Sequence, residues 1–108
     1  MNALLRPALY KACHQILIDG KPQSDSAKYL VTGQICENAD IHLRERNFPE
    51  PEAGDIAVIC DAGAYGRVMS SNYNNRSGSA EVLVSGKSYR KIHNRETIED
   101  IFRNVPDF

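Results

Sequence analysis

Apolar residues near the amino terminus recur three or four positions apart, as they do on one face of a helix. Pro7 suits the first turn of such a helix, and the residues that stop it are Asp19-Gly20-Lys21-Pro22. The pattern therefore predicts a helix that begins close to Pro7 and ends before Asp19. Its apolar positions are Leu5, Leu9, Ala12, Cys13 and Ile16.

Four shorter segments further along are rich in β-favouring residues. Residues 28–35 alternate between apolar and polar, and residues 56–60 follow a turn-like stretch rich in Pro and Glu. Residues 81–84 and 89–93 flank Ser85-Gly86-Lys87-Ser88, which has the length and composition of a hairpin connection. The sequence therefore predicts four strands, the last two of them paired in a hairpin.

Helical spacing returns close to the carboxy terminus. The apolar positions there are Ile98, Ile101, Phe102 and Val105. Either Asn94 or Thr97 is available as the amino-terminal cap of this helix. Residues 70–79, by contrast, are polar and have the composition of a loop. We expect a mainly β chain with an amino-terminal helix and a short carboxy-terminal helix.

The chain has 108 residues, which is one domain at most and well short of the roughly 250 residues of a (β/α)₈ barrel. Any active site here must therefore be shared. Thirteen basic and fourteen acidic residues give a net charge of -1 without a block of like charge, so we expect no nucleic-acid or anionic-membrane partner. The sequence shows no signal-peptide pattern and no apolar run near the ~20 residues of a membrane span, which predicts a cytoplasmic protein.

The three cysteines, Cys13, Cys36 and Cys60, are odd in number and show no CxxC spacing. This pattern argues against a disulfide framework and against a zinc site, so we expect three free thiols. The three histidines have no mutual spacing typical of metal ligands, and we interpret each as a surface or structural residue. No metal site is predicted.

Cys36 and Glu37 follow an apolar strand-like run and stand in a segment of small and polar residues, Gly33 to Asp40. Rigid scaffolds often present reactive side chains at such a place. Cys36 is a candidate proton donor and Glu37 a candidate ligand for a cationic group, if the chain bends there, because adjacent side chains diverge on a strand. Taken alone, the dipeptide is more typical of an inert buried thiol beside a solvated carboxylate.

Tyr65 stands between Ala64 and Gly66 in the sequence Asp61-Ala62-Gly63-Ala64-Tyr65-Gly66. Small neighbours let the backbone approach a ligand closely, and a phenol can orient an anion such as phosphate through one donated hydrogen bond. The alternative is an aromatic side chain that packs against the core at a turn.

Arg6 and Tyr10 are four residues apart on the predicted helix and therefore lie on one face of it. From there a guanidinium and a phenol can converge on one carboxylate. The alternative is a solvated arginine beside a partly buried tyrosine.

Several segments resemble, in the same order, the carboxy-terminal domain of diaminopimelate decarboxylases. These are pyridoxal-phosphate (PLP) enzymes of the alanine-racemase-like fold, also called fold type III. The segments are 1–10, 33–40, 54–55, 61–74, 80–84 and 95–97. The asparagine-rich residues 72–76 also fit the family. Gln34 departs from the family's pattern, which usually has proline there, and Thr32 is a second departure.

The resemblance implies a role for each candidate residue. Arg6 and Tyr10 would bind the distal carboxylate of meso-2,6-diaminopimelate, and Glu37 would bind its distal ammonium. Tyr65 would bind the PLP phosphate and lie near the substrate. Cys36 would be the catalytic proton donor to the carbon from which carbon dioxide departs. In this family the Cys36-Glu37 loop reaches the active site of the partner subunit, so a homodimer is implied.

The family's PLP-binding lysine, its histidine stacked on the cofactor ring and its glycine-rich phosphate loop lie in a barrel, and no lysine of this chain lies in a matching motif. The resemblance therefore implies that the chain is a fragment or separately produced domain of a decarboxylase involved in lysine biosynthesis. Residues 1–20 would end the barrel region with a helix, and residues 21–108 would form a β-sandwich or barrel-like domain. We expect the chain to be inactive alone.

Two other interpretations remain open at this point. The first is a related decarboxylase for ornithine, arginine or lysine, in which the cysteine is usually followed by aspartate rather than by a residue such as Glu37. The second is a non-catalytic dimerisation or regulatory module derived from a decarboxylase. Such a module need not keep Cys36, Glu37 and Tyr65 together.

Overall fold

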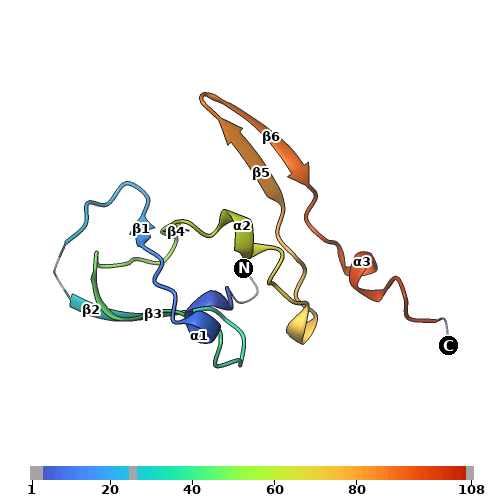
Figure 1. Ribbon diagram of the computed structural model, residues 1–108, viewed down its shortest axis with the longest axis horizontal. Helices are drawn as coiled ribbons and strands as arrows, with labels where there is room; N and C mark the ends of the chain where they lie inside the picture. The colour runs from blue at the N-terminus through green and yellow to red at the C-terminus, as the bar shows by residue number, and fades with distance from the viewer. Residues whose placement is uncertain (1–3, 25–26, 107–108) are drawn as a thin grey trace.

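The computed structural model describes residues 4–24 and 27–106, in which the strands form three short antiparallel pairs (Figure 1). The elements are α1 (Arg6–Tyr10), β1 (Ile16–Ile18), β2 (Ala27–Thr32), β3 (Ile41–Phe48), β4 (Ala57–Ile59), α2 (Gly63–Gly66), the 3-10 helix η1 (Tyr73–Asn75), β5 (Glu81–Ser85), β6 (Ser88–His93) and α3 (Ile98–Phe102). Strand β1 pairs with β4, β2 with β3, and β5 with β6. The predicted mainly β class is confirmed.

A small hydrophobic core lies where the β1–β4 pair meets the β2–β3 pair. Its members are Ile16, Ile18 and Phe48, with Tyr29, Val31 and Ile59 packed against them. The rings of Tyr29 and Phe48 meet edge to face, with centroids 6.1 Å apart and planes at 68°. This arrangement adds an electrostatic attraction between the rings to the burial of their surface. The core thus joins the two strand pairs into one scaffold beneath the loops.

Strand β3 was not predicted, because its sequence does not alternate regularly. In the ladder, Tyr29 and Val31 of β2 pair with Arg46 and Leu43 of β3, so β3 carries an extra residue at this point. Glu45 lies there with a φ of 39°, in the left-handed region. The bulge shifts the later residues of β3 by one position, and this allows Phe48 to reach the core.

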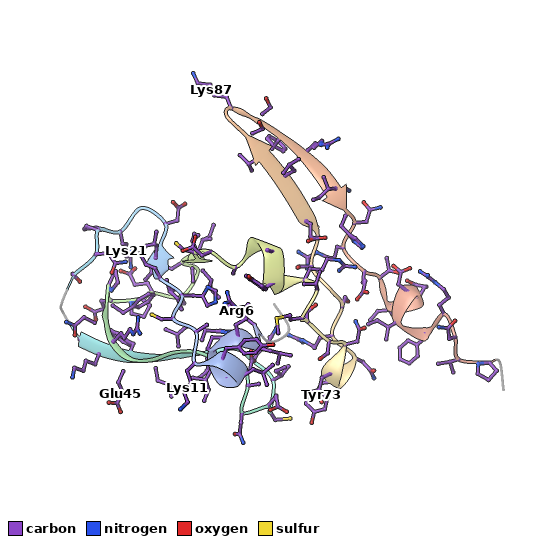
Figure 2. All side chains as sticks on the ribbon, in the orientation of Figure 1. Arg6, Lys11, Lys21, Glu45, Tyr73 and Lys87 are labelled. Atoms are coloured by element: carbon purple, nitrogen blue, oxygen red, sulfur yellow. The ribbon has the colours of Figure 1, made fainter. Side chains whose placement is uncertain are left out.

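The β5–β6 hairpin projects away from the rest of the chain, and Lys87 lies at its tip (Figures 1 and 2). Gly86 in the connection has a φ of +59°, a conformation that favours glycine. Beyond the hairpin, Thr97 caps α3 in a capping box with Asp100, in which each side chain accepts from the other residue's backbone N–H. Both predicted elements are confirmed, and Thr97 rather than Asn94 is the cap.

The predicted amino-terminal helix is wrong beyond Tyr10. Pro7 stands in its first turn as expected, but Lys11 adopts a φ of 55° and ends the helix. Ile16 belongs instead to β1, where it pairs with Ile59 and is buried. Leu9 is 60% exposed, so the predicted apolar face does not form. Pairing with β4 satisfies the backbone and buries Ile16 at once, which overrides the helical spacing.

Within residues 4–24 and 27–106, no helix is long and apolar enough to cross a membrane. The same residues contain no group of three or more His, Cys, Asp and Glu side chains that could hold a metal ion. The three cysteines are free thiols.

Candidate functional site

The loop that joins β2 to β3 carries Cys36 and Glu37, and Asp40 organises it. The Gly33 N–H donates to the Asp40 carbonyl oxygen over 2.8 Å, and the Asp40 N–H donates to the Glu37 carbonyl oxygen over 2.9 Å. The Asp40 carboxylate accepts from the Ile35 N–H over 3.1 Å. Asp40 is only 2% exposed. The loop is therefore closed by hydrogen bonds at both of its ends.

Gly33 is required by this closure. A β-carbon at position 33 would collide with both carboxylate oxygens of Asp40. Since Asp40 is buried, its carboxylate has little room to move away. The close approach of the buried Asp40 side chain therefore explains why residue 33 is a glycine.

The side chains of Cys36 and Glu37 are exposed and have different neighbours. The Cys36 Sγ accepts a hydrogen bond from Asn74 Nδ2 over 3.4 Å. The Glu37 Oε1 accepts from the Ala39 N–H over 3.1 Å, within its own loop. The loop thus presents a thiol and a carboxylate at the surface, as the predicted bend required.

Arg6 and Tyr65 lie together, and their direct contact was not among the predicted interactions. The guanidinium carbon of Arg6 is 3.9 Å from the centroid of the Tyr65 ring and lies over it. Figure 2 shows Arg6 on the side of α1 that faces α2. Such a cation–π contact stabilises both side chains by about 0.5–1 kcal/mol at an exposed site. The structure therefore joins two of the predicted site groups into one.

Tyr65 is held on a short turn of small residues. Its N–H donates to the Ala62 carbonyl oxygen over 3.0 Å, as does the Gly66 N–H over 2.7 Å. Ala62 is buried, whereas Tyr65 is 38% exposed. The backbone of α2 is thus anchored while the phenol stays accessible. Its hydroxyl makes no hydrogen bond to any other described residue, and one neutral donor of this kind fits a phosphate oxygen.

Tyr10 ends α1, one helical turn after Arg6 on the same side. It is 65% exposed. Their spacing on α1 is the predicted one, and the convergence of the guanidinium and the phenol on one carboxylate stays a prediction.

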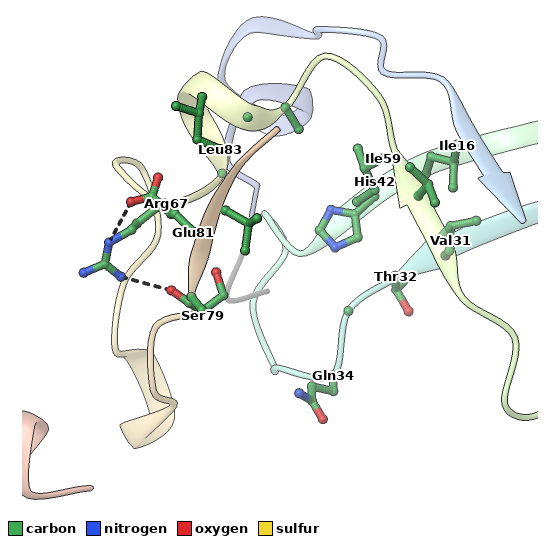
Figure 3. A pocket seen from close by; sticks show the side chains of 18 of the residues that line it. Ile16, Val31, Thr32, Gln34, His42, Ile59, Arg67, Ser79, Glu81 and Leu83 are labelled. Carbon is green, nitrogen blue, oxygen red and sulfur yellow. Dashed lines mark hydrogen bonds and ion pairs between the residues drawn. The ribbon is translucent and has the colours of Figure 1, made fainter. Parts of the chain in front are cut away.

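An open hollow of about 990 Å³ lies between the β2–β4 side of the molecule and the α2–β5 side (Figure 3). Its apolar lining includes Val31, Val58, Ile59 and Leu83. Its charged members, Arg67 and Glu81, pair with each other over 3.4 Å. None of the five predicted site residues lines the hollow. It is an apolar space behind the candidate loops rather than a site for a charged ligand.

Arg67, which the sequence reasoning missed, connects α2 to the β5–β6 hairpin. Its Nη1 donates to the Ser79 carbonyl oxygen over 3.4 Å (Figure 3). Its Nη2 lies 2.8 Å from His93 Nε2. Together with the ion pair between Arg67 Nε and Glu81, these contacts engage all three nitrogen atoms of the guanidinium group. Arg67 is therefore a structural residue that fixes the hairpin to the turn carrying Tyr65.

Glu96 anchors the same region from the other side. Its carboxylate accepts from the Gly78 N–H over 2.6 Å and from Asn72 Nδ2 over 2.7 Å. These hydrogen bonds, the Gly78 one first, lower the pKa of Glu96. A β-carbon on Gly78 would lie 2.8 Å from Arg67 Nη1 and 2.9 Å from this carboxylate, so a side chain there would displace the ends of one or both side chains.

Two of the three histidines, His14 and His42, are buried, and each has a described partner for one ring nitrogen. His14 Nδ1 is 2.9 Å from the Cys60 carbonyl oxygen. His42 Nε2 is 3.3 Å from Asp40 Oδ1. Burial lowers the pKa of His42, and the neighbouring Asp40 partly opposes that effect. The neutral form of His42 is therefore favoured beneath the Cys36 loop.

Comparison with known families identifies the family to which the sheet pairs belong. Residues 1–63 match the model of the family described as "Pyridoxal-dependent decarboxylase, C-terminal sheet domain". The chain belongs to this family. The predicted fold type III relationship is thereby confirmed, and the pairs β1–β4 and β2–β3 lie inside the matched part of this sheet domain.

Curated relatives of the sheet domain are named diaminopimelate decarboxylase. The protein of Archaeoglobus fulgidus is 44% identical over 93% of this chain, and that of Methanothermobacter thermautotrophicus is 44% identical over 97% of it. Among solved structures, the diaminopimelate decarboxylase of M. jannaschii matches 99% of the chain and 24% of its own, with a TM-score of 0.80 and 37% identity. The chain spans about a quarter of the length of these relatives.

Proposed function

We propose that this chain is the carboxy-terminal part of a diaminopimelate decarboxylase, which converts meso-2,6-diaminopimelate into L-lysine and carbon dioxide in the cytoplasm. The names of the relatives support this assignment, and so does a solved relative from Helicobacter pylori described as complexed with L-lysine, which matches 92% of the chain at 38% identity. The structural observation that supports it is the contact of Arg6 with Tyr65. In the proposal, Arg6 would bind a substrate carboxylate and Tyr65 would bind the PLP phosphate, so the contact fits one shared site.

PLP, when bound in the complete enzyme, accepts the electron pair that is left when the substrate carboxylate departs. From this chain, the Tyr65 hydroxyl would hold it by one hydrogen bond to the phosphate. The remaining contacts, including the lysine, would come from a barrel outside the described residues. The division of the protein at residue 20 between barrel and sheet domain belongs to the same proposal.

Arg6 and Tyr10 bind the distal carboxylate of the substrate in this proposal. The contact with Tyr65 uses the face of the Arg6 guanidinium, and its N–H groups, which lie at the edge, stay available for a bidentate pair with a carboxylate. Tyr10 can add a hydrogen bond from the same face of α1. The cation–π contact therefore pre-orients Arg6 and lowers the entropy that it loses when substrate binds.

Cys36 and Glu37 act at the two ends of the substrate. Glu37 pairs with the distal ammonium. At the reacting end the bond between the α-carbon and the carboxylate breaks, carbon dioxide leaves, and the electron pair of that bond, which PLP would accept when bound, finally forms the new C–H bond. The Cys36 thiol gives its proton to that carbon, and the resulting thiolate takes a proton from water before the next turnover. Because both side chains are exposed, the loop can serve the active site of a partner subunit in a homodimer.

The test is carbon dioxide release from meso-diaminopimelate by the complete protein, with this chain joined to its barrel and loaded with PLP. Wild type should release carbon dioxide and form lysine in equal amounts. Cys36→Ala should lower kcat with a modest change in KM, because the proton donor acts after substrate binding. A complete, folded protein that accepts ornithine or arginine but not diaminopimelate would overturn the assignment.

A further inference from the structure

One hydrogen bond connects the Cys36 loop to a segment far away in the sequence. Asn74 Nδ2 donates to Cys36 Sγ over 3.4 Å, a distance within the range for a sulfur acceptor. Asn74 belongs to η1, the 3-10 turn drawn beside the label of Tyr73 in Figure 2. The sequence marked this segment as an ordinary polar loop.

Hydrogen bonds and backbone conformation hold the η1 turn in one arrangement. Asn72 Nδ2 donates to the Arg76 carbonyl oxygen over 3.0 Å and to Glu96 over 2.7 Å, which closes the turn at its base. Asn74 and Asn75 have φ values of 58° and 54°. Among residues with side chains, asparagine is one of the few that tolerate this left-handed conformation. The backbone therefore aims the Asn74 amide in one direction without support from a longer helix.

We infer that Asn74 is the positioning residue of Cys36, and this inference rests on the proposed function. In the contact the sulfur is the acceptor and the amide is the donor, so the thiol proton is not used. Asn74 thus fixes Sγ in one place and leaves the S–H proton free for transfer to the substrate carbon. Asp40 closes the loop backbone, and Asn74 holds the reactive atom itself.

The first experiment compares Asn74→Gly with Asn75→Gly in the complete enzyme. Glycine adopts the left-handed conformation at no cost, so both variants keep the turn. Asn75 makes no hydrogen bond to Cys36 among the described residues. We expect Asn74→Gly to lower kcat roughly 10- to 100-fold with little change in KM, as for a misplaced catalytic group. Asn75→Gly should stay close to wild type, and equal losses in the two variants would overturn the inference.

A double-mutant cycle separates positioning from a structural role. If Asn74 acts through the thiol, Asn74→Gly should cause no further loss of kcat when Cys36 is already alanine. An undiminished loss in the Cys36→Ala background would show that Asn74 supports the site by another route and would overturn the inference.

A measurement without substrate keeps the contact testable if the proposed reaction is wrong. At about pH 10 an ordinary thiol is ionised, and a donated hydrogen bond then lowers its nucleophilicity. Alkylation of Cys36 by iodoacetamide, normalised to that of Cys13 in the same protein, should therefore be about threefold faster in Asn74→Gly than in wild type or Asn75→Gly. An unchanged or slower rate contradicts the contact. Faster alkylation in a protein that does not decarboxylate diaminopimelate would retain the contact and reject the function.

Discussion

The buried carboxylate of Asp40 occupies the space that a side chain at Gly33 would need. The two residues are also joined by the hydrogen bond from the Gly33 N–H to the Asp40 carbonyl oxygen. The loop between them, which holds Cys36 and Glu37, is therefore shaped by one glycine and one buried acid. This relationship makes the position of the candidate proton donor sensitive to a single methyl group.

Gly33→Ala in the complete protein should therefore be destabilising by about 1–3 kcal/mol, as for other cases of overpacking. It should also lower kcat, because the Cys36 loop must shift. Urea denaturation and steady-state kinetics would measure both effects. Gly63→Ala is the stability control, since a β-carbon there would meet no atom within 4 Å. A Gly33→Ala protein with wild-type stability and kcat would show that the loop is not held as described.

Thr97→Ala should lose about 1 kcal/mol of local stability in α3, because it removes the side-chain oxygen that accepts from the Asp100 N–H. Hydrogen exchange of the α3 amides would measure the loss. Asn94→Ala is the matched control, since Asn94 was the other cap that the sequence allowed. Equal protection of α3 in the two variants would contradict the observed cap.

The contribution of Glu96 should depend on pH. Its pKa is lower in the folded protein than in the unfolded chain, so its stabilisation is present above the unfolded pKa and is lost as pH falls through the folded one. Glu96→Gln should lower the melting temperature at about pH 7 and have a smaller effect at about pH 3, where an ordinary carboxylate is protonated. If the difference in melting temperature between Glu96→Gln and wild type were as large at about pH 3 as at about pH 7, the pH-dependent role of Glu96 would be contradicted.

The isolated chain should self-associate through the β5–β6 hairpin. Val84 and Tyr89 are opposite each other in the ladder and therefore share a face, and Tyr89 is 80% exposed. Sedimentation of the isolated chain should show a mass that rises with concentration. The double substitution Val84→Ser, Tyr89→Ser should reduce that rise, whereas Ser85→Ala, Ser88→Ala should not. A monomeric wild-type chain across a wide concentration range would refute the prediction.

Local patterns predicted the elements whose contacts are local. The β5–β6 hairpin and the cap of α3 depend on residues within a short stretch, and both formed as expected. Strand β1 was predicted as part of a helix because three residues are too few to show the alternation of a strand. Its partner β4 lies far along the chain, so no local signal marks the pairing. Strand β3 was missed because the bulge at Glu45 breaks its alternation.

The candidate site shows the same limit. Gly33, Cys36 and Glu37 could be singled out because they stand together in the sequence. Asp40 could have been suspected as an acid between a glycine-containing loop and a strand, but its burial depends on the packing of two strands. The contact of Arg6 with Tyr65 joins segments whose proximity no periodicity predicts. The roles of Arg6, Tyr10, Cys36, Glu37 and Tyr65 stay predictions.

In the proposed function, Arg6 binds the second carboxylate of a diamino dicarboxylic acid. We would therefore measure kcat/KM for meso-diaminopimelate and for lysine in the complete wild-type enzyme and in Arg6→Ala. Loss of the stacking on Tyr65 affects both substrates and cancels in the ratio of the two losses. We predict a loss on the order of 2–5 kcal/mol in transition-state stabilisation for diaminopimelate and little for lysine. Equal losses for the two substrates would contradict the claim.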